Sequence, residues 1–496
     1  MTSLWHASGP TIALEKPQQR DGFDAVVVGA GITGLTTAAL LAERGARVVV
    51  LEAREVGAAA TGSTTAKLSL LQGDRLHRIL GLAPRDAVQA FVDGSLEGAR
   101  QLRAMLDGTE ALRSKPAVSY ATTAEGAEAV DRELHAAAEL GLPVERGGAA
   151  SLPFEMSAAI QLADQGELDP MAMLATLAEL LRSRGGRIVR ASVRRVRVSG
   201  GRVSVETDAG AWSARTVVLA TGAPVPARGS AAMLGAHRSY AASYRTSAPL
   251  PAVMALGVDA RGHSLRTARI DGEELLIAGG GGHAVGRHHD PREIVAELDR
   301  WVHAHWPDAE RTHAWSAQDY RTPDRLPWIG ARPGSRGRVL LATGFDKWGM
   351  SSGAMSALAL AGRIDGAEPE WAEMLRRRGT TPAAAGSLVG TVAATARAQV
   401  VAVSRALAPA SPPAEGEGAL GRSGLRLVAT STVDGETRQV SAVCPHVGAL
   451  VQWNAQERSW DCSAHGSRFA PDGTRLEGPA ACPLSAARAP EGAQRH

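Results

Sequence analysis

AVVVGAGITGLTTAALLAERGARVVVLE, residues 25–52, is the stretch that decides the fold. A short apolar run, residues 25–28, predicts a buried strand before a glycine-rich turn. Residues 35–44 predict a helix, and residues 47–51 predict a second strand that ends on Glu52. This is the pattern of a βαβ unit that binds a dinucleotide.

The three glycines of this turn have separate roles. Gly29 allows a tight turn, Gly31 lets the backbone approach a pyrophosphate, and Gly34 lets the helix pack close to the strand. Glu52 follows at the spacing of an acid that accepts hydrogen bonds from a ribose. A turn without a ligand would explain the glycines, but not the strand, helix and acid around them. The N–H groups of the helix N-terminus, which suit phosphates, belong to Ile32 and Thr33.

The segment after Glu52, AREVGAAATGSTTAK (residues 53–67), is rich in small and hydroxyl residues. Its hydroxyls and backbone amides suit the ribityl chain and phosphates of a flavin. At this point the sequence resembles FAD enzymes of the D-amino-acid-oxidase-like superfamily, which includes glycine and sarcosine oxidases. The resemblance implies that the segment lies along FAD, with contacts from Ala53, Arg54, Thr61, Gly62, Ser63, Thr64, Thr65 and Lys67.

Composition narrows the class of protein. A chain of 496 residues predicts two to four domains. Lys and Arg number 54 against 51 Asp and Glu, so nothing indicates nucleic acid or an anionic membrane as a partner. The first twenty residues lack the pattern of a secretory signal. Only three cysteines occur, so we expect no disulfide framework and a cytoplasmic protein.

The middle of the chain predicts a further helix and strands of the FAD-binding fold. Asp169 as N-cap and Pro170 at the first helical position start a helix, and strands follow at residues 187–191, 193–198 and 202–207. The resemblance implies that backbone near Val193 lies on the adenine.

Two apolar runs share an ending. TVVLATG (residues 216–222) and RVLLATG (residues 338–344) both predict buried strands that end in glycine. Two ordinary core strands would explain the valines and leucines, but not the repeated ending. In the family that the chain resembles, both strands end against FAD, which implies contacts from Thr221, Gly222 and Gly344.

Residues 237–249 and 265–278 predict strands of a second sheet. In the family this sheet covers the flavin and forms the substrate pocket. Tyr240 and Tyr244 are therefore candidate catalytic residues, and Arg238 and Arg245 candidate pocket residues, although each is also explained as a residue on the sheet surface. The run Gly279–Gly282 lacks a following helix and acid, so we expect no nicotinamide domain.

A turn and a helix start follow the second ATG strand, as FDKWGMSS (residues 345–352). A helix N-terminus here would place N–H groups on the pyrimidine carbonyls of the flavin, as the family does. Lys347 is a candidate catalytic residue that adds positive charge near the flavin or a substrate carboxylate, and an exposed lysine is the alternative. The other residues implied here are Asp346, Gly349, Met350 and Ser351.

Residues 379–407 are rich in alanine and valine. They include Pro382, Gly386 and Gly390, so we interpret them as a docking helix and expect no membrane span. A proline- and glycine-rich linker follows.

The last part of the chain holds two ligand pairs, Cys444 with His446 and Cys462 with His465. With the glycines around them, they resemble a Rieske [2Fe–2S] domain, in which two thiolates hold one iron and two imidazoles the other. A Cys₂His₂ zinc site is the alternative. In many Rieske domains two further loop cysteines form a disulfide.

Ala449 and Ala464 stand at those places here, which favours a lower-potential, ferredoxin-like cluster. We expect Cys482 to be a buried free thiol.

The predicted architecture is a Rossmann-type α/β FAD-binding domain with an inserted α+β substrate domain, followed by an all-β Rieske domain. The oxidoreductase spans residues 1–378, the docking helix and linker 379–410, and the Rieske domain 411–496. Within the first range, the ranges 20–75, 165–225 and 325–370 are assigned to FAD, and 76–164 and 226–324 to the substrate domain.

This combination predicts an enzyme that dehydrogenates a C–N bond of an amine or amino acid. Electrons would pass from FAD to the cluster and then to an external acceptor, such as a ferredoxin-like protein. Two alternatives stay open: an oxidase in which O₂ reoxidises FAD and the cluster is auxiliary, and an electron-transfer module whose partner protein performs the substrate chemistry.

Overall fold

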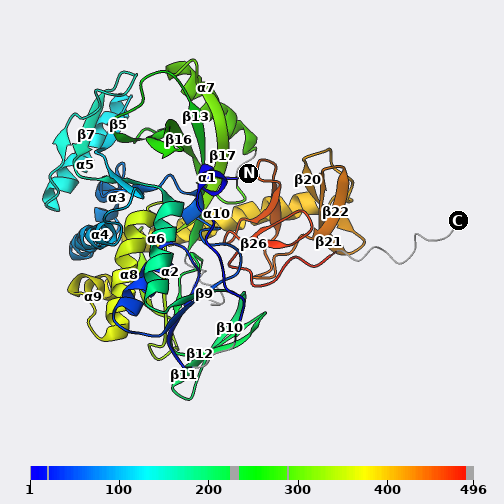
Figure 1. Ribbon diagram of the computed structural model, residues 1–496. Helices are drawn as coiled ribbons and strands as arrows, with labels where there is room; N and C mark the ends of the chain where they lie inside the picture. The colour runs from blue at the N-terminus through cyan, green and yellow to red at the C-terminus, as the bar shows by residue number, and fades with distance from the viewer. Residues whose placement is uncertain (1, 19–21, 224–233, 288–289, 487–496) are drawn as a thin grey trace. The chain divides into compact units, whose positions relative to one another are not determined.

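The computed structural model describes residues 2–18, 22–223, 234–287 and 290–486, which form two compact units (Figure 1). The first unit comprises residues 1–224, 238–282 and 294–387, and the second comprises residues 225–237, 283–293 and 388–496. The domain boundaries predicted near residues 20 and 225 fall outside the described residues.

An eight-stranded sheet in the first unit has the order β10-β11-β12-β1-β2-β9, extended by β19 on β12 and by β18 on β19. The two strands predicted from the runs with the Ala-Thr-Gly ending are β12 and β19, which are parallel neighbours with Val217 opposite Val339. The strands are β1 (Phe23–Val28), β2 (Val48–Glu52), β9 (Arg187–Arg190), β10 (Val193–Ser199), β11 (Arg202–Thr207), β12 (Gly210–Leu219), β18 (Trp328–Ala331) and β19 (Val339–Thr343).

Helix α2 (Ile32–Glu43) follows β1, as the glycine pattern of residues 29–34 predicts, and nearly all of it is buried. We call residues 29–34 the fingerprint turn. It lies beside α6 (Pro170–Ser183) and α8 (Gly349–Asp365) (Figure 1). The Asp169 carboxylate accepts from the N–H groups of Met171 and Ala172, which confirms the predicted start of α6.

A second eight-stranded sheet has the order β17-β13-β16-β15-β14-β5-β7-β6. Residues 265–278 belong to this sheet, as predicted, but Asp271 and Gly272, both with positive φ, reverse the chain and divide the range into two antiparallel strands. The strands are β5 (Ala117–Ala121), β6 (Glu145–Arg146), β7 (Ala158–Leu162), β13 (Gly235–Arg245), β14 (Met254–Gly257), β15 (Ser264–Ile270), β16 (Glu273–Ala284) and β17 (Glu310–Arg321).

The remaining elements of the first unit are mainly helices. Helix α7 contributes Leu298 and Val302 to an apolar core shared with residues of β13 and β16. The elements are α1 (Leu4–Ser8), α3 (Arg75–Leu80), α4 (Arg85–Met105), α5 (Ala124–Glu139), α7 (Arg292–His305), α9 (Glu370–Arg377), a short 3₁₀ helix at Thr61–Ser63, and a small sheet of β3 (Lys67–Leu68), β8 (Gly166–Leu168) and β4 (Leu112–Ser114).

Two antiparallel sheets form the C-terminal part of the second unit, in the orders β20-β21-β22 and β23-β24-β25-β26. Their shared core contains Cys444, Cys462, Trp460 and Phe469. The strands are β20 (Gly418–Ser423), β21 (Arg426–Val433), β22 (Glu436–Ser441), β23 (Val451–Asn454), β24 (Ser459–Cys462), β25 (Arg468–Phe469) and β26 (Arg475–Glu477).

Helix α10 (Pro382–Ala406) precedes these sheets and is continuous through Gly386 and Gly390. By length and composition it is long and apolar enough to cross a membrane. Only 6% of its apolar window is buried, so it does not pack as a core helix, but a single helix of this kind is weak evidence for a span. The absence of a membrane span therefore stays a prediction.

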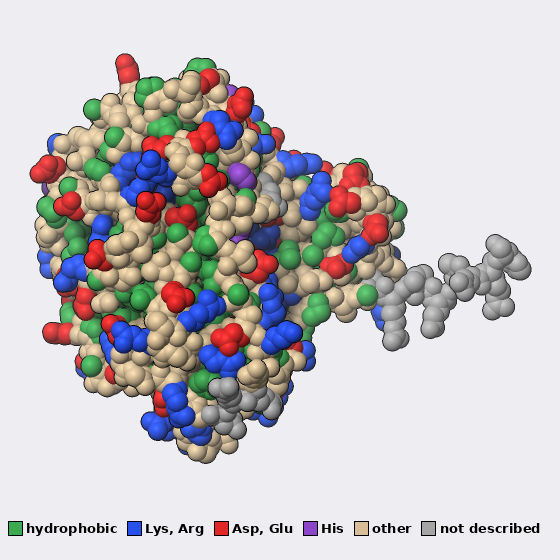
Figure 2. Space-filling view, viewed as in Figure 1, with side chains coloured by type: hydrophobic (Ala, Val, Ile, Leu, Met, Phe, Trp, Pro, Cys, Tyr) green, Lys and Arg blue, Asp and Glu red, His purple; other side chains and the backbone are tan. Residues whose placement is uncertain are grey.

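The surface bears charges of both signs. Figure 2 shows Lys and Arg side chains interspersed with Asp and Glu side chains on the visible face, in agreement with the formal net charge of +3.

Candidate functional site

Two glycines of the fingerprint turn, Gly29 and Gly34, leave no room for a side chain. A Cβ on Gly29 would lie 2.6 Å from the carbonyl oxygen of Ala220, and one on Gly34 would lie 2.0 Å from the carbonyl oxygen of Gly29. Gly31 is the N-cap of α2 and makes no side-chain cap. The turn is therefore a backbone cradle at a helix N-terminus, which suits a pyrophosphate.

Glu52 lies at the end of β2 beside this cradle. Its carboxylate accepts from the backbone N–H groups of Ala30 and Arg54, each at 2.9 Å. These bonds tie the acid to the fingerprint turn, and its predicted contact with a ribose stays a prediction.

The segment after β2 is held through its carbonyl oxygens. Four consecutive carbonyls, those of residues 62–65, accept hydrogen bonds from side chains distant in the sequence. The donors are Ser3 Oγ to Gly62, Trp315 Nε1 to Ser63, Trp5 Nε1 to Thr64 and an Arg266 guanidinium N–H to Thr65.

Sequence reasoning missed these donors, since no local pattern links the N-terminal helix to the loop. In addition, the Thr61 hydroxyl accepts from the N–H of Ile32 at 3.2 Å.

The ends of β12 and β19 meet at the same edge of the first sheet. Gly222 and Gly344 both have positive φ, +71° and +78°, and the Thr343 hydroxyl donates to the carbonyl oxygen of Gly222. A Cβ on Gly344 would lie 2.5 Å from Thr322 Cγ2. The carboxyl ends of parallel strands are where open α/β sheets bind ligands.

The turn between β19 and α8 is strained and polar. Asp346 and Lys347 have positive φ, +47° and +72°, which is unusual for residues other than glycine. The Asp346 carboxylate pairs with Arg321 at 2.6 Å, and the Asp319 carboxylate accepts from the N–H of Lys347. We call residues 344–350 the Lys347 turn.

Several charges converge on the Lys347 turn. Loss of solvent raises the pKa of Asp319 to about 6, against backbone hydrogen bonds that favour its charge. Lys347 is exposed, which is the alternative that the sequence left open, although contact with the neighbouring atoms of the turn and the charge of Arg321 still lower its pKa. At Asp346 burial opposes the charge, but Arg321, Arg75 and Arg325 outweigh it and the pKa falls.

The run of four glycines on β16 fits against this lysine. A Cβ on Gly282 would lie 2.2 Å from Lys347 Nζ and 3.2 Å from Ser239 Oγ. The absence of a side chain at Gly282 therefore makes room for Lys347 at the second sheet. Sequence analysis found the run but gave it no such role.

The two candidate tyrosines face helix α7. Tyr244 donates to the carboxylate of Asp299 at 2.8 Å, and Tyr240 packs against Ile294 and Val295. The neighbouring Ala241 instead joins the core that contains Trp315, on the other face of β13. The catalytic role of both tyrosines stays a prediction.

The arginines of β13 are engaged elsewhere. Arg238 is buried and bonds Ser316 and Gln318, and Arg245 pairs with Glu273 at an exposed site. Lys67, predicted to contact FAD, donates to the carbonyl oxygen of Ala255 at 2.6 Å.

Three further predicted FAD contacts lie on regular elements. Val193 starts β10, and Met350 and Ser351 lie in the first turn of α8, where Ser351 bonds Ser69.

The four predicted cluster ligands come together in two pairs. Cys444 and Cys462 are buried, and their thiols lie close enough to hydrogen-bond, which helps to lower the pKa of Cys444 to about 7. The rings of His446 and His465 are 5.0 Å apart. One sulfur pair and one imidazole pair are the donor set of a Rieske cluster.

The protonation state of the His465 imidazole suits a metal ligand. Burial lowers the pKa of His465 to about 4, so the ring is neutral at pH 7. Its Nδ1 is buried and makes no hydrogen bond within the described residues. A buried, unpaired and neutral imidazole nitrogen is suited to bind iron.

A single-ion site does not form among the described residues, since no three His, Cys, Asp or Glu side chains there converge on one ion. A structural zinc would need four ligands around one point. The prediction that Cys482 is buried is wrong: the thiol is exposed, because it follows β26 in a segment without regular structure.

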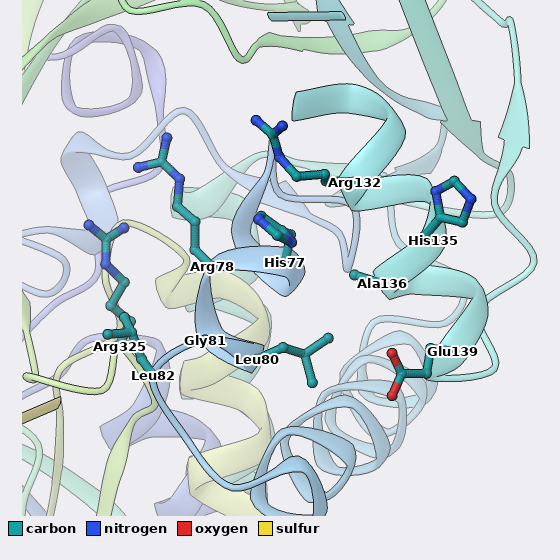
Figure 3. Close-up of a pocket in the computed structure, with 10 residues that line it drawn as sticks. All are labelled: His77, Arg78, Leu80, Gly81, Leu82, Arg132, His135, Ala136, Glu139 and Arg325. Carbon is teal, nitrogen blue, oxygen red and sulfur yellow. The ribbon is translucent and has the colours of Figure 1, made fainter. Parts of the chain in front are cut away.

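A separate hollow of about 650 Å³ lies between α3 and α5 (Figure 3). Basic side chains dominate its lining, and its carboxylate, Glu139, bonds Arg85. None of the predicted site residues lines it. The labelled residues are His77, Arg78, Leu80, Gly81, Leu82, Arg132, His135, Ala136, Glu139 and Arg325.

Comparison with known families matches both parts of the chain. Residues 24–363 match the FAD dependent oxidoreductase family, and residues 401–488 match the Rieske [2Fe-2S] domain. A protein of Bacillus subtilis (strain 168), named as a Rieske 2Fe-2S iron-sulfur protein, is 28% identical over 97% of this chain and 96% of its own length.

Solved structures share the fold of the larger part. Glycine oxidase from Geobacillus kaustophilus superposes with a TM-score of 0.59 at 21% identity, over 70% of this chain and 96% of its own. L-amino acid deaminase from Proteus vulgaris gives 0.60 at 16% identity, over 73% of this chain and 97% of its own.

Proposed function

Because the chain belongs to the family of FAD-dependent oxidoreductases and carries a C-terminal Rieske [2Fe–2S] domain, we propose that it dehydrogenates the C–N bond of an amino acid. In this proposal electrons pass from FAD to the cluster and then to an external one-electron acceptor in the cytoplasm. Bound FAD accepts a hydride, two electrons together, whereas the cluster carries one electron at a time.

The net charge of the Lys347 turn is the observation on which the proposed substrate class rests. Four cationic side chains gather there against the two carboxylates of Asp319 and Asp346. The excess of positive charge favours a substrate that bears a carboxylate over a simple amine. The cations are Arg75, Arg321, Arg325 and Lys347.

The names of the structural neighbours include enzymes that act on amino acids. Their names specify a glycine oxidase and an L-amino acid deaminase, and a third neighbour is named L-proline dehydrogenase, from P. horikoshii. At 16–21% identity these likenesses establish the fold. The substrate class therefore rests on the charge of the turn.

Strand β16 supports the electron path. It belongs to both units, since Gly282, which meets Lys347, lies in the first and His283 in the second. Four residues after Gly282, Gly286 packs against Ser463, the residue after the ligand Cys462. β16 ends at Ala284, so a short stretch of chain beyond it connects the glycine beside Lys347 to the glycine beside Ser463.

The test is an anaerobic screen of amino acids and of the amines that lack their carboxylate, followed by loss of flavin absorbance. We expect reduction by an amino acid and little by its decarboxylated analogue. Lys347→Gln should raise the KM for the amino acid about 10- to 150-fold, the range that a charged hydrogen bond of about 1.5–3 kcal/mol gives. Lys16→Gln, at an exposed lysine, is the matched control.

Equal reduction by both compounds, or an unchanged KM in Lys347→Gln, would contradict the assigned substrate class. Fast reoxidation by O₂ with little use of the cluster would instead support the oxidase alternative.

A further inference from the structure

The loops that hold the cluster ligands are contacted by residues outside the matched Rieske domain. That match begins at residue 401, yet the second unit also includes residues 283–293 and the part of α10 from residue 388. Residues 283–293 lie within the match to the flavin family. The surroundings of the cluster are therefore not made by the Rieske domain alone.

Gln399 of α10 bonds both ligand loops. Its Oε1 accepts from the N–H of Leu450 at 2.7 Å, and its Nε2 donates to the carbonyl oxygen of Leu450 at 3.1 Å. Nε2 also donates to the hydroxyl of Ser463 at 2.8 Å. Leu450 follows the first ligand pair and Ser463 follows Cys462, so one side chain connects the two loops.

The segment after β16 holds Ser463 from another side. Arg287 donates to the carbonyl oxygen of Ser463 at 3.4 Å and also bonds the Thr395 hydroxyl on α10. A Cβ on Gly286 would lie 2.9 Å from the Ser463 nitrogen. Ser463 is only 4% exposed, so its hydroxyl, its carbonyl and its backbone are all enclosed.

Packing alone does not explain a glutamine at this position. One and two turns further along α10, Ala402 and Ala406 are fully buried in the same apolar core as Cys444, Leu450 and Cys462. An apolar residue at position 399 would extend that contact. A polar amide whose hydrogen-bonding atoms meet two loops indicates a role in fixing them.

We propose that Gln399 is a positioning residue for the [2Fe–2S] cluster, and that with Arg287 it fixes the two ligand loops relative to each other. The loops direct backbone N–H groups at the ligand sulfurs: those of His446 and Val447 at Cys444, and those of Ala464 and His465 at Cys462. Hydrogen bonds to the sulfurs tune the reduction potential of such clusters. Residues outside the Rieske domain therefore set the potential of this cluster.

The test uses the full-length, cluster-loaded protein. Gln399→Met keeps the length of the side chain and removes all three hydrogen bonds, and Ser404→Ala on the same helix is the control. The readouts are the midpoint potential of the cluster and the EPR spectrum of its reduced form. We expect Gln399→Met and Arg287→Met each to lower the potential and broaden the EPR lines, while Ser404→Ala matches the wild type.

Gln399→Glu retains the acceptor for Leu450 N–H, so its EPR lines should be narrower than those of Gln399→Met. If Gln399→Met loses iron, Arg287→Met and Gln399→Glu still report the potential and the line shape. A wild-type potential and spectrum in the variants that hold iron would overturn the proposal. The test does not depend on the substrate, so it fails or succeeds independently of the proposed reaction.

Discussion

The cluster loops and the Lys347 turn differ in their balance of charge. Around the cluster the second imidazole is neutral, and the nearby Arg468 is balanced by Glu457, Asp461 and Glu477. At the Lys347 turn positive charge exceeds negative charge. Retention of the cluster thus depends on a fixed set of ligands, whereas substrate affinity at the turn depends on the sum of several charges.

This difference predicts two kinds of response to substitution. Removing one ligand should abolish the cluster, because each iron needs both of its protein ligands. Removing one charge at the turn should change affinity by degrees and with pH, because the remaining charges still act.

His465→Ala is the largest expected effect. The variant lacks one imidazole ligand, so iron and the EPR signal of the reduced cluster should be lost. Turnover with a one-electron acceptor protein should fall at least ~100-fold, since loss of a partner of the ligands alone costs 10- to 100-fold. Flavin reduction by substrate should change little, and small two-electron dyes should restore turnover. Wild-type turnover in this variant would place the cluster off the electron path.

Gly31→Val separates the two cofactor sites. Its side chain would enter the cradle, where even a Cβ lies 3.0 Å from Thr61 Oγ1. Overpacking of ~1–3 kcal/mol corresponds to roughly 5- to 150-fold weaker binding of FAD. Flavin and iron are measured on the same sample, and iron should stay at the wild-type level. A normal flavin content would count against the pyrophosphate cradle.

Asp319→Asn tests the graded response at the turn. With a pKa of about 6, Asp319 becomes charged as the pH rises through 6 and offsets part of the positive charge. The KM for an amino acid should therefore rise about three-fold between pH 5 and pH 7 in the wild type and stay flat in the variant. Asp107→Asn, at an exposed position, is the control, and the same KM profile in both variants would exclude Asp319.

The same group affects stability with a defined sign. The folded protein keeps the Asp319 proton up to about pH 6, whereas an unfolded chain releases it near the ordinary value of 3.8. Stability should fall as the pH rises between these values, and thermal unfolding of Asp319→Asn should lack this part of the decline.

Tyr244→Phe is the smallest expected effect. It removes the hydrogen bond to Asp299 and should lower the free energy of unfolding by ~1 kcal/mol. Flavin reduction by substrate should stay at the wild-type rate, because the ring faces α7. A large loss of reduction with normal stability would restore Tyr244 as a catalytic residue.

The sequence predicted most where a short motif fixes the direction of its side chains. The fingerprint glycines, the Asp169 cap and the four cluster ligands are local patterns, and the structure has each as expected. On β13 the choice of face depends on register, and a shift of one residue exchanges Tyr240 for Ala241. No local pattern fixes that register.

The sequence also could not predict contacts between segments that lie far apart in the chain. Trp5, Trp315 and Arg266 hold the loop of residues 62–65, and Gln399 holds the cluster loops, through contacts that only the tertiary fold creates. The strand run at residues 265–278 concealed a turn at Asp271 because apolar residues continue on both sides of it.

The central claim is that electrons pass from FAD to the cluster within one chain. The most direct measurement mixes the oxidised protein rapidly with a reducing amino acid in the absence of O₂, and follows flavin absorbance and the EPR signal of the reduced cluster in the same time course. The account predicts that flavin absorbance falls first and that the cluster signal then grows, with flavin loss alone in His465→Ala. A cluster that stays oxidised while the flavin is fully reduced would contradict the account.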